Sequence, residues 1–358
     1  MLDEVWVHAI GGAEALVGDA VTAESEGWDG IYLSANPLTV PDPWVAMALA
    51  ARETKRLRFG TGVLTPVSQI AATVAGSATT VHQTSGGRVV VGLGRGDHTV
   101  AMLGMDLMPL ATFERYLTRV QSYLRGEQVP FDIDLDGRGL FPPAPADGHF
   151  GTTSALSFHV APDSAYRKVP VEIFGSGPRV LAVGARHADR LTVAVGGDPA
   201  RVAWALSIAR EAMARAGRDP HDVRLGAVVP VCVHPDREQA RRLVRGAVTS
   251  SARFVSMQGF VPEQVSDTDK EVYLALRSTD GHEAASAEFI DRYAILGSVD
   301  ECVERLEQLI ALGITRIAFG LPLITPSMDT PTVDALHASR QAIIEVVVPR
   351  LRRRPSSR

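Results

Sequence analysis

Three segments of the sequence end a strand-like pattern in glycines and polar residues, the kind of place where a ligand can approach a backbone closely. The first spans residues 60–66 and reads Gly-Thr-Gly-Val-Leu-Thr-Pro. A glycine inside a strand tends to mark a bulge or a ligand contact, although it can also make room for a neighbouring side chain. Gly62, Val63 and Thr65 are therefore candidate ligand contacts, and the packing interpretation stays open.

The second segment spans residues 86–98 and contains Gly-Leu-Gly-Arg-Gly at residues 92–96. These glycines are spaced too evenly for the dinucleotide-binding fingerprint, and we expect no helix directly after them. What remains is a strand end that carries Arg95, Asp97 and His98, together with Gly94 and Gly96. A histidine can exchange a proton near neutral pH. Solvated loop residues would give the same pattern.

The third segment breaks a strand pattern with Gly175-Ser176-Gly177, and Pro178 then opens a helical pattern. Free backbone N–H groups at a helix start, reinforced by the helix dipole, form an anion site suited to phosphate. An ordinary turn between a strand and a helix would look similar, so the spacing alone leaves both interpretations open.

The elements that would position these segments alternate between short apolar runs and longer helical patterns, which is typical of parallel β/α units. Eight strands are expected, as many as an α/β barrel needs. The active site of such a barrel lies at the C-terminal ends of its strands. The expected strands are residues 5–9, 30–34, 57–63, 88–92, 169–174, 190–195, 225–233 and 314–319.

The sequence therefore predicts an α/β fold, a (β/α)8 TIM barrel formed as one domain by residues 1–350. Two insertions interrupt the pattern, at about residues 128–168 and 257–293. Long insertions in a barrel usually lie over the mouth of the active site. Residues 351–358 form a basic, solvated tail.

Composition excludes several classes of function. The net charge is -5, which argues against a broad surface for nucleic acid. No apolar run is long enough to span a bilayer and no signal peptide pattern is present, so we expect a cytoplasmic protein that does not bind membranes. The two cysteines, Cys232 and Cys302, lack the spacing of a metal site. They are expected in a strand and a helix, respectively, and no metal is predicted.

Several motifs, taken in their order along the chain, resemble the luciferase-like monooxygenase superfamily. The resemblance is greatest to its F420-dependent branch, similar to methylenetetrahydromethanopterin reductase. The matching stretches include Asp-Pro-Trp at 42–44, Arg-Phe-Gly-Thr-Gly-Val at 58–63, Ser-Gly-Gly-Arg at 85–88, Gly-Leu-Gly-Arg-Gly-Asp at 92–97 and Phe-Glu-Arg-Tyr-Leu at 113–117. They resume at residues 170–188, 296–298 and 313–315.

The resemblance implies a bacterial luciferase-like barrel that binds coenzyme F420 or, alternatively, FMN. It implies a cis peptide bond between Gly62 and Val63, placed against one face of the redox ring. It also implies that residues 94–97 line the cofactor and that residues 175–177 hold its phosphate. Relatives are often dimers, so a homodimer is expected. Trp44, His98 and Phe113 are candidates for the substrate wall or for proton exchange, although Trp44 and Phe113 could equally be core residues.

One departure from the family affects catalysis. Relatives usually place an Asp, or an Asp-His pair, at the end of the second strand, whereas this sequence reads Ser-Ala-Asn-Pro at residues 34–37. Asn36 is then a hydrogen-bond donor at most, and no strong acid or base is present there. Asn36 and His98 are the catalytic candidates.

Three hypotheses about function follow. The first is hydride transfer between F420 and a small organic or natural-product substrate, in which the cofactor performs the redox chemistry and the protein supplies orientation. The second is an FMNH2-dependent monooxygenase. The third is a flavin-binding barrel without catalytic turnover.

Overall fold

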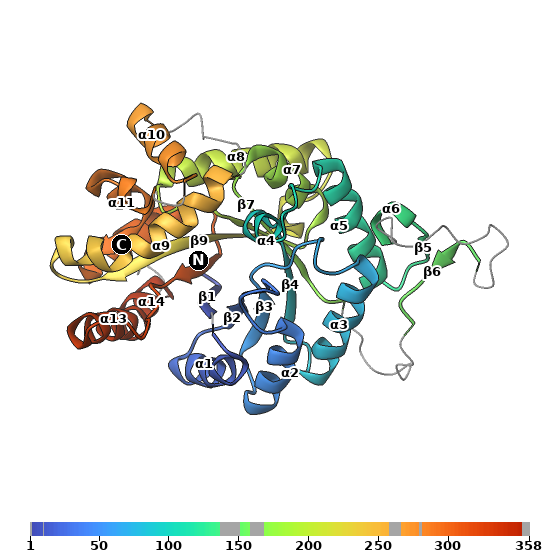
Figure 1. Cartoon of the computed structure of the whole chain (residues 1–358), viewed down its shortest axis with the longest axis horizontal. Coiled ribbons are helices and arrows are strands. Elements are labelled where there is room, and N and C mark those ends of the chain that lie inside the picture. Colours follow the sequence, from blue (N-terminus) through green and yellow to red (C-terminus); the bar gives the residue numbers. More distant parts are fainter. Residues whose placement is uncertain are drawn as a thin grey trace, which may run out of the picture.

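Eight parallel strands close into a barrel in the computed structural model, which describes residues 2–9, 11–136, 151–157, 168–257, 266–278 and 281–352 (Figure 1). Consecutive barrel strands pair side by side, and β9 closes the ring by pairing with both β8 and β11. The predicted TIM barrel is confirmed, and each expected strand coincides with a barrel strand. The barrel strands are β1 (Glu4–Ala9), β2 (Gly30–Leu33), β3 (Arg58–Thr61), β4 (Val89–Leu93), β7 (Val171–Gly175), β8 (Arg190–Val193), β9 (Arg224–Val233) and β11 (Arg316–Gly320).

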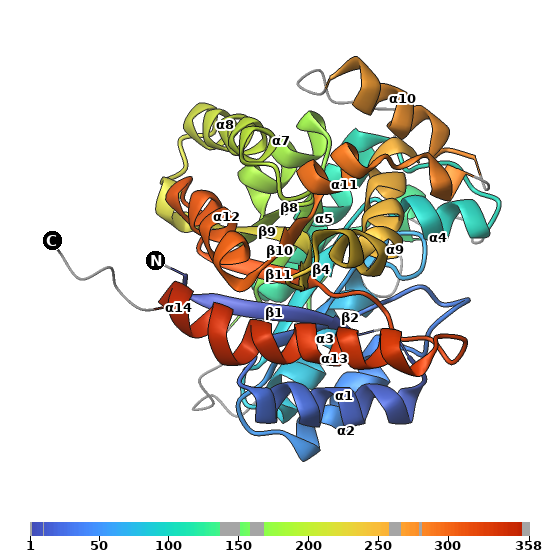
Figure 2. The same cartoon turned by 90° about the vertical axis from the view of Figure 1, so that its left-hand side faces the viewer.

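Helices surround the barrel, and several begin at a side-chain cap that the sequence makes visible (Figures 1 and 2). Asp42 accepts hydrogen bonds from the backbone N–H groups of Trp44 and Val45 at the start of α2. Ser298 and Glu301 form a capping box at the start of α12. The surrounding helices are α1 (Ala13–Glu26), α2 (Pro43–Glu53), α3 (Ala71–Thr84), α5 (Leu110–Leu124), α7 (Pro178–His187), α8 (Pro199–Arg215), α12 (Val299–Ala311) and α13 (Thr330–Ala342).

Shorter elements complete the described chain. A π-helical turn (Ile343–Val347) and α14 (Val348–Arg352) continue α13, and a 3₁₀ turn (Pro220–Asp222) precedes β9. None of the helices in the described ranges is long and apolar enough to cross a bilayer. Of the expected basic tail, residues 353–358 lie outside the described residues.

The second insertion belongs to a small core of its own beside the barrel. β9 extends past the barrel and pairs there with β10 (Ile295–Gly297), a strand that the sequence analysis did not expect. The buried side chains of this second core include Cys232, Val248 and Phe289. Cys232 lies on β9 and Cys302 on α12, as predicted, and both thiols are buried. The helices of this core are α9 (Arg237–Met257), α10 (Asp267–Ala275), a 3₁₀ turn (Gly281–Ala284) and α11 (Ala287–Tyr293).

The first insertion lies elsewhere than expected. Its described part contains β5 (Val129–Pro130), α6 (Ile133–Asp136) and β6 (Thr153–Ser154), and it packs on the C-terminal half of α5. The Tyr123 hydroxyl lies 2.7 Å from the Ser154 hydroxyl. Because this insertion follows a helix and precedes a strand, it joins the barrel at the N-terminal ends of the strands. For these residues, the expectation of a cover over the mouth is therefore wrong.

Alternate strand residues point into the barrel and fill its lower half. Trp6 and Tyr32 stack there with ring centroids 4.5 Å apart, and both are fully buried. Glycines on neighbouring strands make this possible: a Cβ atom on Gly30 would lie 2.5 Å from the Trp6 ring, and one on Gly60 would lie 2.5 Å from the Tyr32 ring. For Gly60, the structure therefore supports the packing interpretation.

A network of buried charges surrounds these two rings. The Glu172 carboxylate is fully buried and accepts hydrogen bonds from the Tyr32 hydroxyl at 2.8 Å, from the Arg316 guanidinium at 2.5 Å and from Thr192. Glu4 accepts from Trp6 and forms ion pairs with arginines. Its partners are Arg58 at 2.5 Å, Arg224 at 3.2 Å and Arg190.

Removing one member of this network should destabilise the protein strongly. Arg316→Met leaves the Glu172 carboxylate buried without its main counter-charge, and breaking a buried pair in this way typically costs about 3 to 5 kcal/mol. Urea unfolding of the variant and the parent would measure the loss. The matched control is Arg215→Met, which breaks an exposed pair with Glu211 at the end of α8 and should cost less than about 0.5 kcal/mol. Equal losses for the two variants would contradict this assignment.

Acid should weaken the fold through Glu4. Burial disfavours its charge, but Arg190, Arg58 and Arg316 outweigh that effect and lower its pKa from 4.5 to about 2. Because the unfolded state binds this proton more readily, the contribution of Glu4 is present above pH 4.5 and is lost as the pH falls toward 2. Unfolding free energies measured between pH 5 and pH 2 should fall in the parent and fall less steeply in Glu4→Gln. Parallel curves would refute this role of Glu4.

Candidate functional site

The C-terminal ends of the barrel strands form one face of the molecule, here called the mouth. In Figure 2, β1 runs from left to right, and α4 (Asp97–Met102) lies at the right beyond the strand ends. α4 also contacts α9, so the second core borders the mouth. All three glycine-rich segments of the sequence end at this face, where barrel enzymes carry their active sites.

The first segment forms the centre of the candidate site. The peptide bond between Gly62 and Val63 is cis, as the family resemblance implies, and both residues are partly exposed. A Cβ atom on Gly62 would lie 2.7 Å from Cε1 of His8 and 2.9 Å from Cβ of Tyr32. Only glycine fits at this position without displacing its neighbours, and the peptide remains accessible from the mouth.

The second segment packs directly against the first. A Cβ atom on Gly94 would lie 2.8 Å from Cγ2 of Val63, and one on Gly96 would overlap the Thr65 side chain. Gly96 also has a φ of +83°, a conformation that glycine adopts easily. These two glycines therefore have a packing role: they let the ends of β3 and β4 approach each other.

α4 begins at Asp97, directly after Gly96. The expectation that no helix starts at once was wrong, because a helix of six residues is too short to show apolar periodicity. The Arg95 guanidinium donates to the backbone oxygen of Met108, from Nε at 3.0 Å and from Nη2 at 2.5 Å. Arg95 thus fastens the chain that follows α4 to the end of β4.

The two catalytic candidates meet at the mouth. The side-chain nitrogen of Asn36 lies 3.2 Å from Nδ1 of His98 and 3.4 Å from the sulfur of Met102. The Asn36 side-chain oxygen accepts from the backbone N–H of Leu38 at 3.1 Å, which fixes the orientation of the amide. Asn36 is buried and His98 is exposed. Residues 62 positions apart in the sequence therefore form one polar pair.

The third segment has the form of an anion site. α7 begins at Pro178, and its N-cap, Gly177, gives the helix no side-chain cap. Ser176 is buried, and its hydroxyl has no hydrogen-bond partner within the described ranges. The backbone N–H groups and this hydroxyl are therefore available to a bound group, and a phosphate suits such a helix start.

Thr65 offers a second buried hydroxyl. Its Oγ1 atom has no hydrogen-bond partner in the described part of the chain, although the residue is almost fully buried. Buried polar groups normally have partners, so an orphaned hydroxyl here needs an explanation. A bound polar ligand would supply one. The orphaned hydroxyl of Thr65 and the unpaired hydroxyl of Ser176, which is not cut off from the surface, fit a cofactor with a polar ring and a phosphate.

Trp44 and Phe113 pack in the main core. Phe113 is fully buried, and Trp44 is 6% exposed and donates its indole N–H to the side-chain oxygen of Gln69 at 3.0 Å. Both side chains therefore have the structural role that the sequence analysis had weighed. Substrate contact by either residue stays a prediction.

His8, the last inward-pointing residue of β1, is a site residue that was not among the candidates predicted from the sequence. Its ring centroid lies 5.3 Å from that of Tyr32, and its ring touches Gly62. Burial lowers its pKa from 6.5 to about 4, although the charge of Glu172 acts in the opposite direction. The alternation of Glu4, Trp6 and His8 along one strand was the signal that could have placed it inside the barrel.

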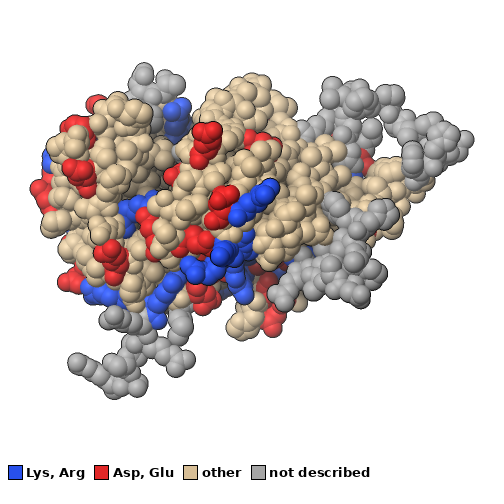
Figure 3. Space-filling model, turned by 90° about the horizontal axis from the view of Figure 1, so that it is seen from below, with Lys and Arg blue, Asp and Glu red and all other residues tan. Residues whose placement is uncertain are grey.

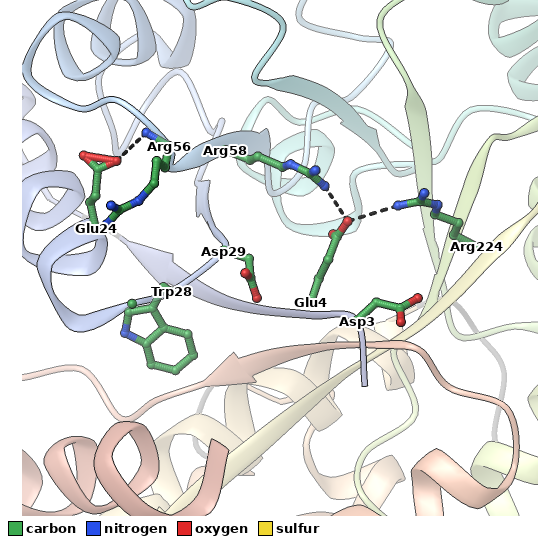
Figure 4. Close-up of a pocket in the computed structure, with 9 residues that line it drawn as sticks. Asp3, Glu4, Glu24, Trp28, Asp29, Arg56, Arg58 and Arg224 are labelled. Atoms are coloured by element: carbon green, nitrogen blue, oxygen red, sulfur yellow. Dashed lines mark hydrogen bonds and ion pairs between the residues drawn. The ribbon is translucent and has the colours of Figure 1, made fainter. Parts of the chain in front are cut away.

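A separate cavity of about 450 Å³ lies at the opposite end of the barrel (Figure 4). Arg58 and Arg224 both point toward Glu4 there, and the Glu24 carboxylate accepts from the backbone N–H of Arg56. Figure 3 shows acidic and basic side chains interspersed on another face, without a broad area of one sign. Most of the charged side chains that line the cavity pair with one another. We therefore assign this cavity a structural role rather than a role in binding a ligand.

Comparison with known proteins agrees with the fold. The family model for luciferase-like monooxygenases matches residues 3–316. The chain is 24% identical over 311 residues to a 5,10-methylenetetrahydromethanopterin reductase of Methanolobus tindarius, covering 85% of this chain and 89% of the relative. It is 27% identical over 360 residues to an F420-dependent glucose-6-phosphate dehydrogenase of Microbacterium testaceum, covering 96% and 95%.

Among solved structures, it resembles a coenzyme F420 dependent tetrahydromethanopterin reductase from Methanopyrus kandleri. The TM-score is 0.72 at 16% identity, over 98% of this chain and all of that one. At that identity the likeness concerns the fold, whereas the family model spans most of the sequence. The chain belongs to the luciferase-like monooxygenase family and is a flavin- or F420-dependent oxidoreductase.

Proposed function

We propose that the protein is an F420-dependent oxidoreductase that transfers a hydride between the deazaflavin and a small organic or natural-product substrate. The observation that carries the proposal is the accessible Gly62–Val63 peptide at the mouth, with the Asn36–His98 pair on the same face. The F420-dependent names among the relatives that match most of the chain favour this cofactor over FMN.

The chain offers suitable groups at each part of such a cofactor. The flat Gly62–Val63 peptide, with no side chain on Gly62, can lie against one face of the redox ring. The start of α7, with Gly175, Ser176 and Gly177, can hold the phosphate. The region around Thr65 and residues 94–97 would border the ring, because Gly94 and Gly96 bring β4 against β3.

The bound deazaflavin would supply a carbon that accepts or gives up a hydride. The chain would orient the substrate above that ring and exclude water from the barrel side of it. The Asn36 amide can donate a hydrogen bond to a substrate oxygen, because Leu38 holds its orientation. His98, next to that amide, is exposed and can exchange a proton with solvent.

An FMNH2-dependent monooxygenase is the second candidate, because the family as a whole carries that description. It would use the same barrel and much of the same site, but it would react with oxygen. The hypothesis of a barrel that binds a flavin without turnover is set aside, because the chain belongs to a family of oxidoreductases.

A fluorescence titration tests the cofactor directly. We expect the purified protein to bind oxidised F420 tightly and FMN weakly or not at all. Tight binding of FMN together with oxygen-dependent product formation would favour the monooxygenase. If neither compound binds, the common premise of both candidates fails.

Substitution of Gly62 tests the placement of the ring. Gly62→Ala adds a methyl group 2.7 Å from His8 and 2.9 Å from Tyr32, so these side chains must shift at the floor of the site. F420 affinity should fall at least tenfold. The matched control is Gly76→Ala on α3, where an added Cβ has nothing within 4 Å, and its affinity should be unchanged. Parent-like affinity in Gly62→Ala would show that the ring binds elsewhere.

A further inference from the structure

His8 occupies the one inward position of β1 that borders the candidate site. Below it, Trp6 and Tyr32 fill the barrel, and beside it lies Gly62 of the cis peptide. A Cβ atom on Gly62 would be 3.4 Å from Nδ1 of His8 and nearer still to its Cε1 atom. The edge of the imidazole ring is therefore in contact with the segment on which the redox ring is proposed to rest.

The imidazole has no hydrogen-bond partner within the described ranges. Its ring nitrogens remain accessible from the surface, and the residue as a whole is partly exposed. Among the described residues, the barrel nitrogens of Arg190 and Arg316 that lack hydrogen-bond partners belong to guanidinium groups whose other nitrogens are hydrogen-bonded. His8 differs because it is a polar side chain at the boundary between the filled half of the barrel and the mouth, with its hydrogen-bonding capacity unused.

The groups around His8 determine the protonation state of its imidazole ring. The charged and titratable groups that face it are Glu172 on β7 and Tyr32 on β2, and the Glu172 charge is already neutralised by Arg316 and Arg190. The imidazole is thus neutral near pH 7. A neutral imidazole carries one N–H donor and one acceptor nitrogen, whereas an imidazolium has only donors.

We propose that His8 is a cofactor-contacting residue of the deazaflavin site, where its neutral imidazole forms a hydrogen bond with the redox ring. This inference rests on the proposed function. The pyrimidine part of a deazaflavin ring carries both N–H donors and carbonyl acceptors, so it matches a side chain that offers one of each. His8 lies on β1, the strand that pairs with β2, and the end of β2 carries Asn36 rather than an acid or a histidine.

The first experiment observes the imidazole itself. In protein labelled with ¹⁵N-histidine, the His8 resonances are assigned by their loss in His8→Gln, and oxidised F420 is then added. We expect the His8 ring resonances to shift on binding, while those of His221, which lies exposed in the 3₁₀ turn before β9 at the other end of the barrel, stay in place.

The second experiment separates hydrogen bonding from packing. His8→Leu keeps an apolar side chain of similar size and should weaken F420 binding about tenfold, the upper end of what one hydrogen bond contributes. His8→Gln retains a donor and an acceptor and should stay within a few-fold of the parent. His221→Leu is the control and should bind like the parent. A purely structural role would give the reverse order, with leucine tolerated and glutamine not.

The results distinguish this inference from the proposed function. If the parent binds F420 but the His8 resonances do not move, or if His8→Leu binds as tightly as the parent, the role of His8 is refuted and the proposed cofactor stands. If the parent binds no F420, both are refuted.

Discussion

The buried carboxylate of Glu172 is the interaction on which the rest of the structure depends. It accepts hydrogen bonds from Tyr32, Thr192 and Arg316, which come from three different barrel strands. A buried charge must be paired and hydrogen-bonded, so these strands cannot change register without a large cost. Because the network and the Trp6–Tyr32 stack fill the lower barrel, the interior is left for a ligand only at the mouth.

This filling also explains the glycines. Gly30 and Gly60 admit large aromatic side chains, whereas Gly62 lies above them and leaves its peptide open. Gly94 and Gly96 serve the close approach of two strand ends. Glycines that look alike in sequence therefore have different roles, which depend on how far each lies from the mouth. Only the glycines nearest the mouth reach the candidate site.

The sequence predicts the barrel well, because buried parallel strands give short apolar runs and helix caps depend on neighbouring residues. Asp42 and Ser298, for example, each cap a helix that begins directly after them. The three strand ends were recognised from glycines and from a family resemblance. By contrast, β10 has only three residues and α4 only six, so neither is long enough to show a periodic pattern of apolar residues. The Asn36–His98 pair and the contact of His8 with Gly62 arise from strand order and register, which local sequence does not encode.

The account's central claim is that a deazaflavin ring lies on the Gly62–Val63 peptide at the mouth. A crystal structure of the protein grown with F420 tests it most directly. We expect ring density against that peptide, with the phosphate at Gly175, Ser176 and Gly177. Density for the ring at the other end of the barrel, in the cavity lined by Arg56, Arg58 and Arg224, would contradict it.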